Sequence, residues 1–349
     1  MRWILRIGLA ALLLVVLAVG VVATSVLLSL DWDRRHRETT ARLPVLDEAT
    51  TGPEPTLVRV EANGMTFRAR VAGLDNDGPA VVLLHGFPES SAMWLPLVRA
   101  AAAAGHRVIA FDQRGYSPGA RPDDVSDYGV PELVGDVVAV ADAAGFDRFH
   151  LVGHDWGCVV GWGVTIRHPE RVLTWNGLSI PHPGALAAEL RAERPAYIRI
   201  FTAPLVPEAM LAWNDFANLR EGAYAGATPA QREEYLSLFA EPGALTAALD
   251  WYRAITTSLA GSDADVGPVE GVPTLFLWGT RESWVNANRL ALQRELVRAP
   301  YVERELDAGH FLMQEQPEAV VAAVLAHLSR GAAGSPPASP PAVGAAHTP

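Results

Sequence analysis

The 349-residue chain has a single cysteine, Cys158, and no lysine. One cysteine excludes an intrachain disulfide framework and a cysteine-rich zinc site. Without lysine, neither Schiff-base chemistry nor a P-loop is available. The 28 basic residues are therefore all arginine, and they stand against 39 acidic residues for a net charge of −11. Nucleic-acid-binding proteins need a basic surface, so this balance argues against that class of protein.

Two further signals are missing from the sequence. No group of residues has the spacing of metal ligands, and no Gly-x-Gly-x-x-Gly follows a predicted strand, so we expect neither a metal nor a cofactor. What is present is a composition of 50% hydrophobic and 19% charged residues, which is typical of a folded globular protein.

The longest apolar run occupies residues 7–30, which carry no charged side chain. As a helix this run would span roughly 36 Å, enough to cross a hydrocarbon core of about 30 Å. The alternative is a cleaved signal peptide, whose apolar region has only about 7–15 residues. We therefore predict a membrane protein with a single N-terminal span in residues 1–30. Arginines lie on both sides of the run, so the sequence does not decide on which side of the membrane the rest of the chain lies. We expect it outside the cytoplasm.

The rest of the chain divides by composition. Residues 31–56 mix charges with three prolines and are predicted to form a tether. Residues 331–349 are mainly Gly, Ala, Ser and Pro, and we predict a disordered tail. Between them we predict a folded core in two parts, residues 57–184 and 268–330, interrupted by an insertion at residues 185–267.

The core alternates strand and helix patterns. Asn63-Gly64 is a hairpin signal between strands predicted at residues 57–61 and 66–72. Later strands are predicted at residues 80–84, 107–111, 149–152, 172–180, 274–278 and 301–306, and helices at 91–104, 131–144, 156–168 and 316–330. This order indicates an α/β fold with a mostly parallel sheet and helices on both faces. Residues 185–267 show helical patterns (185–194, 207–218, 229–239 and 244–259) and no strand, which predicts an all-helical cap over the strand ends.

Active sites of such sheets lie beyond the carboxyl ends of the strands. After the strand at 149–152 comes Gly153-His-Asp-Trp-Gly157, which has the spacing of a nucleophile elbow. Its central residue is Asp155, whose carboxylate is ionised at neutral pH and can attack carbon to form an ester with the protein. The alternative is that Asp155 only caps the following helix.

Hydrolysis of such an ester needs a base and hydrogen-bond donors. His310 follows the last predicted strand and is the candidate base, and Glu282 follows the strand at 274–278 and is the candidate acid that orients it. The backbone N–H groups of Phe87 and Trp156 are the candidate oxyanion donors. The chain order of nucleophile, acid and histidine is that of α/β-hydrolases.

Four motifs carry a resemblance to the epoxide hydrolase family of the α/β-hydrolase superfamily. They are His85-Gly-Phe-Pro-Glu89, Phe111-Asp-Gln-Arg-Gly-Tyr116, Gly153-His-Asp-Trp-Gly157 and Gly309-His-Phe311, and the resemblance extends over residues 60–327. It implies an α/β-hydrolase fold with a helical cap. It also implies a hydrolase that needs no cofactor and that adds water to a small apolar epoxide to give a diol.

The resemblance also implies two cap tyrosines that donate a proton to the epoxide oxygen. Tyr197 and Tyr252 lie in segments similar to those of the family, and Tyr224 and Tyr235 are the substitutes. The acid of the family is most often aspartate, so Glu282 is a departure from its pattern.

Two other functions remain open at this stage. The first is a haloalkane-type dehalogenase that uses the same Asp155, since those enzymes also carry a tryptophan after the nucleophile. They commonly place asparagine where this chain has Phe87, and fluoroacetate dehalogenases place arginines where it has Trp156 and Val159. The second is a membrane-tethered protein of hydrolase fold that binds a ligand without catalysis.

Overall fold

The computed structural model describes residues 13, 15–17, 19–21, 42–46, 52–192, 195–260 and 267–332. Their centre is an eight-stranded sheet of order β1-β2-β4-β3-β5-β6-β8-β10. The strands are β1 (Thr56–Ala62), β2 (Met65–Ala72), β3 (Ala80–Leu84), β4 (Arg107–Phe111), β5 (Phe149–His154), β6 (Val172–Leu178), β8 (Thr274–Gly279) and β10 (Tyr301–Leu306). Only the pairings of β2 with β1 and with β4 are antiparallel, so the predicted, mostly parallel sheet is confirmed.

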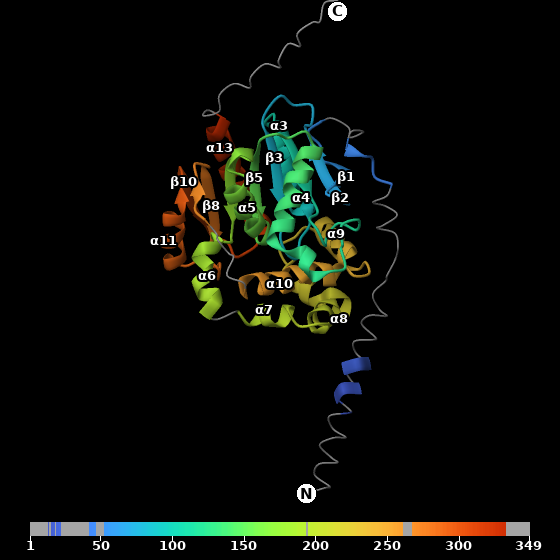
Figure 1. Cartoon of the computed structure of the whole chain (residues 1–349). Coiled ribbons are helices and arrows are strands. Elements are labelled where there is room, and N and C mark those ends of the chain that lie inside the picture. Colours follow the sequence, from blue (N-terminus) through green and yellow to red (C-terminus); the bar gives the residue numbers. More distant parts are fainter. Residues whose placement is uncertain are drawn as a thin grey trace, which may run out of the picture.

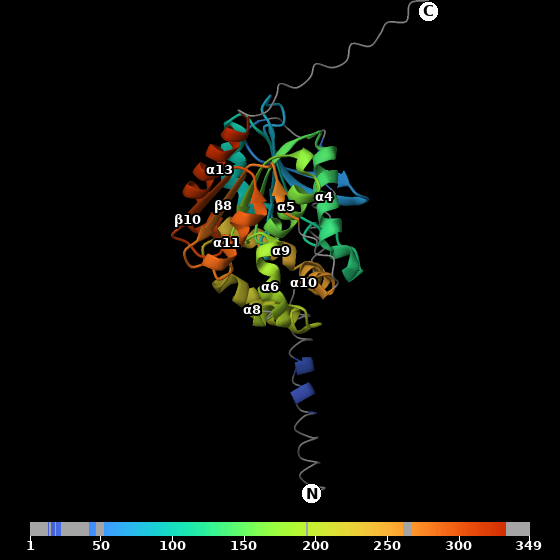
Figure 2. The same ribbon diagram turned by 60° about the vertical axis from the view of Figure 1, so that its left-hand side comes forward.

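Helices cover both faces of this sheet (Figures 1 and 2). Helices α4 (Val130–Ala143) and α5 (Trp156–Arg167) pack on one face, and α3 (Leu95–Ala103) and α13 (Pro317–Ala332) on the other. Helix α3 follows a 3-10 turn, η2 (Ser91–Trp94), so the helix predicted at 91–104 is in fact two elements. Three further short elements, α12 (Leu312–Glu315), η3 (Val125–Tyr128) and η4 (Pro169–Arg171), connect the larger ones.

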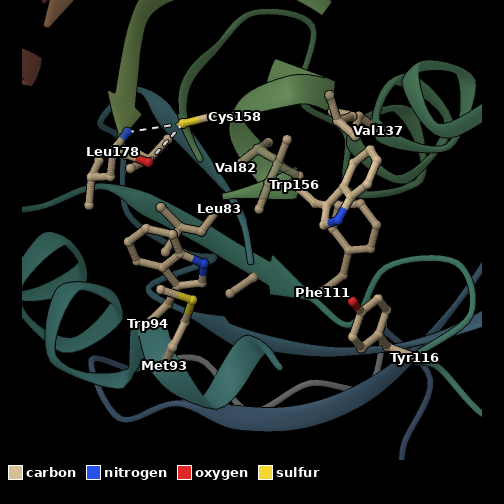
Figure 3. Close-up of a cluster of buried hydrophobic side chains, with 14 of the residues drawn as sticks. Val82, Leu83, Met93, Trp94, Phe111, Tyr116, Val137, Trp156, Cys158 and Leu178 are labelled. Atoms are coloured by element: carbon tan, nitrogen blue, oxygen red, sulfur yellow. Dashed lines mark hydrogen bonds between the residues drawn. The ribbon is translucent and has the colours of Figure 1, made fainter. Parts of the chain in front are cut away.

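The hydrophobic core lies on both sides of the central strands. All five residues of β3 are buried, as expected for a parallel strand covered by helices on both faces. Successive side chains of a strand point to opposite faces. Accordingly, Leu83 lies beside Met93 and Trp94, whereas Val82 lies on the side of Trp156 (Figure 3). The apolar run that predicted this strand therefore fills two packed layers rather than one.

Among the described residues, five helices lie between β6 and the next strand, β7 (Val269–Glu270). They are α6 (Pro183–Ala192), α7 (Ala196–Phe201), α8 (Val206–Glu221), α9 (Pro229–Phe239) and α10 (Ala244–Ala260). The views from two directions place α7 to α10 together at one end of the sheet (Figures 1 and 2). We refer to α6–α10 as the cap. Strand β7 pairs with β9 (Val297–Arg298), and α11 (Ala287–Leu296) precedes β9.

Helix α8 is kinked. Three consecutive residues, Asn214, Asp215 and Phe216, have left-handed backbone angles with φ between 50° and 60°. A left-handed conformation costs a non-glycine residue about 1–2 kcal/mol, so something must hold the kink in place. The side chain of Phe216 is buried in the core of the cap and gives a physical reason for it.

Buried ion pairs join the cap to the sheet. Glu234 of α9 accepts hydrogen bonds from Arg68 and Arg70 of β2, and the Arg68 contact measures 2.9 Å. Glu241, between α9 and α10, pairs with Arg121 at 2.6 Å. Except for Glu234, which is about one-fifth exposed, these side chains are almost fully buried, so the α9–α10 half of the cap and the core form one packed body.

The predicted membrane localisation is contradicted. A membrane-spanning helix needs about 20 consecutive apolar residues. Within the described ranges no helix is long and apolar enough to cross a bilayer, and the longest, α10, has 17 residues. Of the predicted span, residues 1–30, only 13, 15–17 and 19–21 are among the described residues. Most of the predicted tether, 31–56, and tail, 331–349, also lies outside them.

Candidate active site

Asp155 is the single residue that connects β5 to α5. Its φ of 53° and ψ of −120° form a backbone conformation that a non-glycine residue adopts only when its surroundings enforce it. Close packing enforces it here, because a Cβ at Gly157 would collide with the carbonyl oxygen of Leu84. The turn projects the Asp155 carboxylate beyond the carboxyl end of β5, as the elbow spacing predicted.

The two oxygens of Asp155 have different partners. The backbone N–H of Phe87 donates to Oδ1 at 2.8 Å. The approach of Phe87 requires glycine at position 86, since a Cβ there would overlap the Asp155 carboxylate. Oδ2 lies 3.4 Å from His310 Nε2. One oxygen is thus held by a main-chain donor, and the other faces a histidine.

His310 links Asp155 to Glu282. His310 follows β10, and Glu282 follows β8, the strand beside it. The second ring nitrogen, Nδ1, lies 2.5 Å from Glu282 Oε2, so the imidazole bridges two carboxylates. The other oxygen of Glu282, Oε1, accepts from the backbone N–H of Trp284 at 3.0 Å. The longer glutamate side chain therefore still reaches the histidine.

These contacts set the protonation of the site. Burial lowers the pKa of His310, but hydrogen bonds to Asp155 and Glu282 and their negative charges raise it to about 10. Burial raises the pKa of Asp155, yet the bond to His310 and its positive charge bring it below the ordinary 3.8. Burial also raises the pKa of Glu282, and the bond to His310 and its positive charge again bring it below the ordinary value of 4.5. At neutral pH both carboxylates are ionised, and the imidazole between them is protonated.

Hydrogen bonds from two side chains hold the main-chain carbonyl group of His310. His154 Nε2 and the Ser179 hydroxyl both donate to the carbonyl oxygen of His310, each at 2.8 Å. The other ring nitrogen of His154 lies 3.4 Å from Glu89 Oε2. Glu89 accepts at Oε1 from Gln314 at 2.9 Å. His154 thus has the hydrogen-bonding role that its place beside Asp155 suggests.

The candidate residues surround one cavity of about 260 Å³ between the cap and the strand ends. Tyr252 of α10 is buried and Tyr197 of α7 is 38% exposed, so the two tyrosines sit at different depths. Trp156 is the one predicted site residue outside the lining, and its ring lies 4.9 Å from that of Tyr252. The other predicted site residues all line the cavity: Phe87, Asp155, Tyr197, Tyr252, Glu282 and His310.

The substitute tyrosines lie elsewhere. Tyr224 donates to the carbonyl oxygen of Pro88 at 2.5 Å, and its ring lies 5.1 Å from that of Tyr235. Both are buried and neither lines the cavity. The remaining lining residues are Ser283 and seven apolar side chains: Pro88, Phe201, Leu211, Leu219, Ala223, Trp284 and Phe311. Pro88 and Phe311 belong to two of the four sequence motifs, and Trp284 is an aromatic residue two positions after the candidate acid.

No metal centre is evident where the structure describes the chain: those residues contain no group of three or more His, Cys, Asp or Glu side chains that could hold an ion. Cys158 lies under the elbow, where its thiol contacts the main chain of Leu178 (Figure 3). Burial raises the pKa of this thiol, so it stays protonated and packs as an apolar group. The titratable side chains that the structure places at the cavity are those of Asp155, Glu282, His310, Tyr197 and Tyr252.

Comparisons with known proteins agree on fold and family. The family profile of the alpha/beta hydrolase fold matches residues 79–197. Epoxide hydrolase A from Mycobacterium tuberculosis is 31% identical, covering 79% of this chain and 98% of the relative. The crystal structure of epoxide hydrolase A from Mycobacterium thermoresistibile superposes with a TM-score of 0.67 at 27% identity, covering 79% of this chain and 98% of that one. An epoxide hydrolase from Vigna radiata gives 0.69 at 25% identity, covering 79% and 99%.

Proposed function

Because this chain belongs to the epoxide hydrolase family of the α/β-hydrolase superfamily, we propose that it hydrolyses an epoxide to a diol through an ester of Asp155. The chain is a hydrolase of this fold; the reaction steps and the roles of individual residues are the proposal. One observation carries it, namely the two differently held oxygens of Asp155. Oδ1 accepts from the backbone N–H of Phe87, and Oδ2 faces His310 beside the cavity.

In the first step, Asp155 Oδ2 attacks an epoxide carbon. A new C–O bond forms, a C–O bond of the ring breaks, and the ring oxygen becomes an alkoxide. No base is needed, because the carboxylate is already ionised. Tyr197 and Tyr252 supply the proton to that oxygen. Burial and the charge of Asp155 raise the pKa of both phenols above 10, so each is a proton donor at neutral pH.

In the second step, water attacks the ester carbon. The ester has lost the negative charge of Asp155, which is one of the two charges that raise the pKa of His310. The pKa of His310 therefore falls once the ester forms, and the proton it releases balances the one that the tyrosine gave up. Neutral His310 then takes a proton from water, and the negative charge that develops on Oδ1 is held by the backbone N–H groups proposed as donors, those of Phe87 and Trp156. The intermediate collapses as the bond between the carboxyl carbon and Oδ2 breaks, and the departing diol oxygen takes the proton from His310. The Asp155 carboxylic acid that remains gives its proton back to His310, which restores the ionised carboxylate and the protonated imidazole.

Glu282 keeps the imidazole oriented through both steps. Its bond to Nδ1 fixes the ring so that Nε2 faces Asp155, and its charge stabilises the imidazolium that forms when water is deprotonated. The substrates are accordingly a small apolar epoxide and water, with no cofactor. The proposed frame is a core of residues 57–184 and 268–330 and a cap of residues 185–267.

The experiment that tests this mechanism follows the oxygen atoms. With enzyme in excess over styrene oxide in water labelled with oxygen-18, the label should enter the peptide that contains Asp155 and be absent from the first diol released. The ester oxygen of the diol comes from Oδ2, whereas the water oxygen joins the carboxyl carbon. Heavy oxygen in the diol of that single turnover would instead mean that water attacks the epoxide directly.

Dehalogenation is less well supported than epoxide opening. A halide needs N–H donors that face the cavity, but Trp156 is not among the residues that line it. A comparison of styrene oxide with a matched haloalkane separates the two reactions, since an epoxide leaves an adduct of its full mass on Asp155 and a haloalkane leaves one without the halogen.

A further inference from the structure

The two halves of helix α8 each contribute a leucine to the cavity. Leu211 lies before the kink at residues 214–216 and Leu219 lies after it, and both line the cavity. Along a straight helix eight residues rise about 12 Å, so these side chains would lie more than two turns apart. The kink is therefore the feature of α8 that lets both leucines reach one wall.

A hydrogen bond shows how sharply the chain turns at the kink. The side-chain amide of Asn218 donates to the carbonyl oxygen of Met210 at 2.8 Å. These two residues are also eight positions apart, so a straight helix would keep them out of contact. Because they are the chain neighbours of Leu219 and Leu211, the same turn brings the two leucines together at the cavity.

Other contacts hold the turn from both of its sides. On the outside, Arg220 donates to the main-chain oxygen of Asp215 and to its carboxylate, both at 2.9 Å. On the inside, Phe216 is buried in the cap. Left-handed residues of this kind keep their conformation only where the surroundings enforce it, and they concentrate at functional sites. The turn thus presents the leucines as a fixed surface.

The size of the cavity limits what can lie against this surface. The wall that α8 and the residue after its C-cap form is apolar and consists of Leu211, Leu219 and Ala223. The cavity measures about 260 Å³. A cavity of about 150 Å³ is enough for one benzene molecule. The site therefore has room for an epoxide joined to one aromatic ring, and the volume that remains is smaller than a second ring needs.

We propose that Leu211 and Leu219 set the upper size of the epoxide substituent, and that Asn218 is a positioning residue that holds them in place through Met210. The inference rests on the function proposed above and names its substrate class, an epoxide with one apolar substituent of about the size of a single aromatic ring. The ring oxygen of such a substrate lies toward the two cap tyrosines, and its substituent packs against the α8 wall.

The test compares styrene oxide with 4-phenylstyrene oxide, which carries one more phenyl ring. In the wild type, kcat/KM for styrene oxide should be at least about tenfold higher than for the larger epoxide. Leu211→Ala and Leu219→Ala each remove atoms from the wall, so each should lower this ratio about tenfold. Leu236→Ala of α9 is the matched control, because all three leucines are 4% exposed but Leu236 does not line the cavity. It should leave the ratio unchanged.

Asn218→Asp tests the positioning role. The side chain is exposed and keeps its size, so the variant should fold, but it can no longer donate to Met210. The ratio of the two kcat/KM values should fall about threefold, as expected for the loss of one hydrogen bond. In a background that carries both Leu211→Ala and Leu219→Ala, the same substitution should change nothing further, since no wall is left to position.

Each of three results would overturn the proposal. A wild-type enzyme that opens both epoxides equally well, or a ratio that the two wall substitutions leave unchanged, would mean that α8 does not limit the substrate. A fall of the same size in Leu236→Ala would mean that any loosening of the cap has this effect. An undiminished effect of Asn218→Asp in the double background would mean that Asn218 does not act through the leucines.

Failure of the proposed function would look different, because the wild type would then open no epoxide at all. The size limit is measured without turnover by thermal shifts with toluene and biphenyl, which cannot react. Toluene should stabilise both the wild type and Leu219→Ala, whereas biphenyl should stabilise only the variant. Equal stabilisation of the wild type by the two ligands would contradict the size limit, whichever reaction the site performs.

Discussion

Histidines at the two ends of the sheet have different electrostatic surroundings. At the carboxyl ends, His310 lies between two carboxylates, Asp155 and Glu282. At the amino ends, His150 near the start of β5 is fully buried, with its ring 5.7 Å from that of His106, which precedes β4. His150 Nδ1 shares a hydrogen bond of 2.8 Å with the neutral hydroxyl of Thr174.

Burial lowers the pKa of both histidines, but their neighbours differ. Burial is the largest cause that lowers the pKa of His150, repulsion from neighbouring groups that include Arg148 lowers it further, and the pKa falls to about 3. The neighbours of His310 are anionic, and they outweigh burial, so its pKa rises to about 10. The protein thus keeps one histidine neutral at one end of the sheet and another charged at the other. A pair of carboxylates is what reverses the effect of burial at His310.

The largest expected effect comes from a substitution at the carboxyl ends of the strands. Asp155→Ala removes the proposed nucleophile, so epoxide turnover should fall by about 10⁵-fold or more and no covalent adduct should form. The substitution also removes one of the two charges that raise the pKa of His310. A titration of the His310 ring signals by NMR should therefore show a lower pKa than in the wild type. An unchanged His310 pKa would contradict the electrostatic account.

His310→Gln should separate the two steps. Asp155 remains ionised, so the epoxide is opened once, but no base activates water and the ester accumulates. Turnover should fall about 10⁴-fold, and mass spectrometry of the protein should show one adduct of the full substrate mass. If a substrate of the wild type leaves the folded variant unmodified, the division of work between Asp155 and His310 is wrong.

The amino end should govern stability in acid. The folded-state pKa of His150 lies below the unfolded value of 6.5, so its contribution is complete above pH 6.5 and is lost as the pH falls toward 3. The full difference is on the order of 5 kcal/mol. Denaturant unfolding at several pH values should show a shallower loss of stability in His150→Gln than in the wild type. His168→Gln, at a histidine that is 38% exposed, is the control.

The smallest expected effect comes from changing a partner of His310 while the histidine itself is kept. Glu282→Gln keeps the shape of the side chain and removes its charge, so the pKa of His310 should fall toward its ordinary value. Ester hydrolysis should slow about 10²-fold and ester formation much less, because Asp155 attacks without a base. Equal slowing of the two steps in stopped-flow measurements would assign Glu282 a different role.

Much of this arrangement was predictable from the sequence. The strands at residues 80–84, 107–111 and 301–306 have the predicted bounds, since apolar or alternating runs mark them clearly. Because such strands end at the same edge of a sheet, Asp155, Glu282 and His310 could be placed near one another before any coordinates were known.

Other elements left no readable pattern. Helix α11 has as many polar as apolar residues and no continuous apolar stripe, so it was missed. Helix α7 has only six residues, none of them buried. The kink of α8 contains neither glycine nor proline and depends on how Phe216 packs. The cavity walls formed by Leu211 and Leu219 follow from that packing, which explains why the sequence could name the reacting groups but not the shape around them.

The ion pair between Glu234 and two arginines of β2 bears on how enzymes of this architecture diversify. The cap is inserted between two strands, so recombination could in principle exchange it as a cassette between relatives. Arg68 and Arg70 would then meet a foreign helix, and a cassette without an acid at the place of Glu234 would leave two cations buried without a full set of partners. An uncompensated buried charge costs about 3–5 kcal/mol, a large share of the stability of a typical domain. Exchange is therefore open only to caps that bring a matching carboxylate, so Glu234 must be inherited together with two neighbouring arginines that lie 166 and 164 positions before it in the chain.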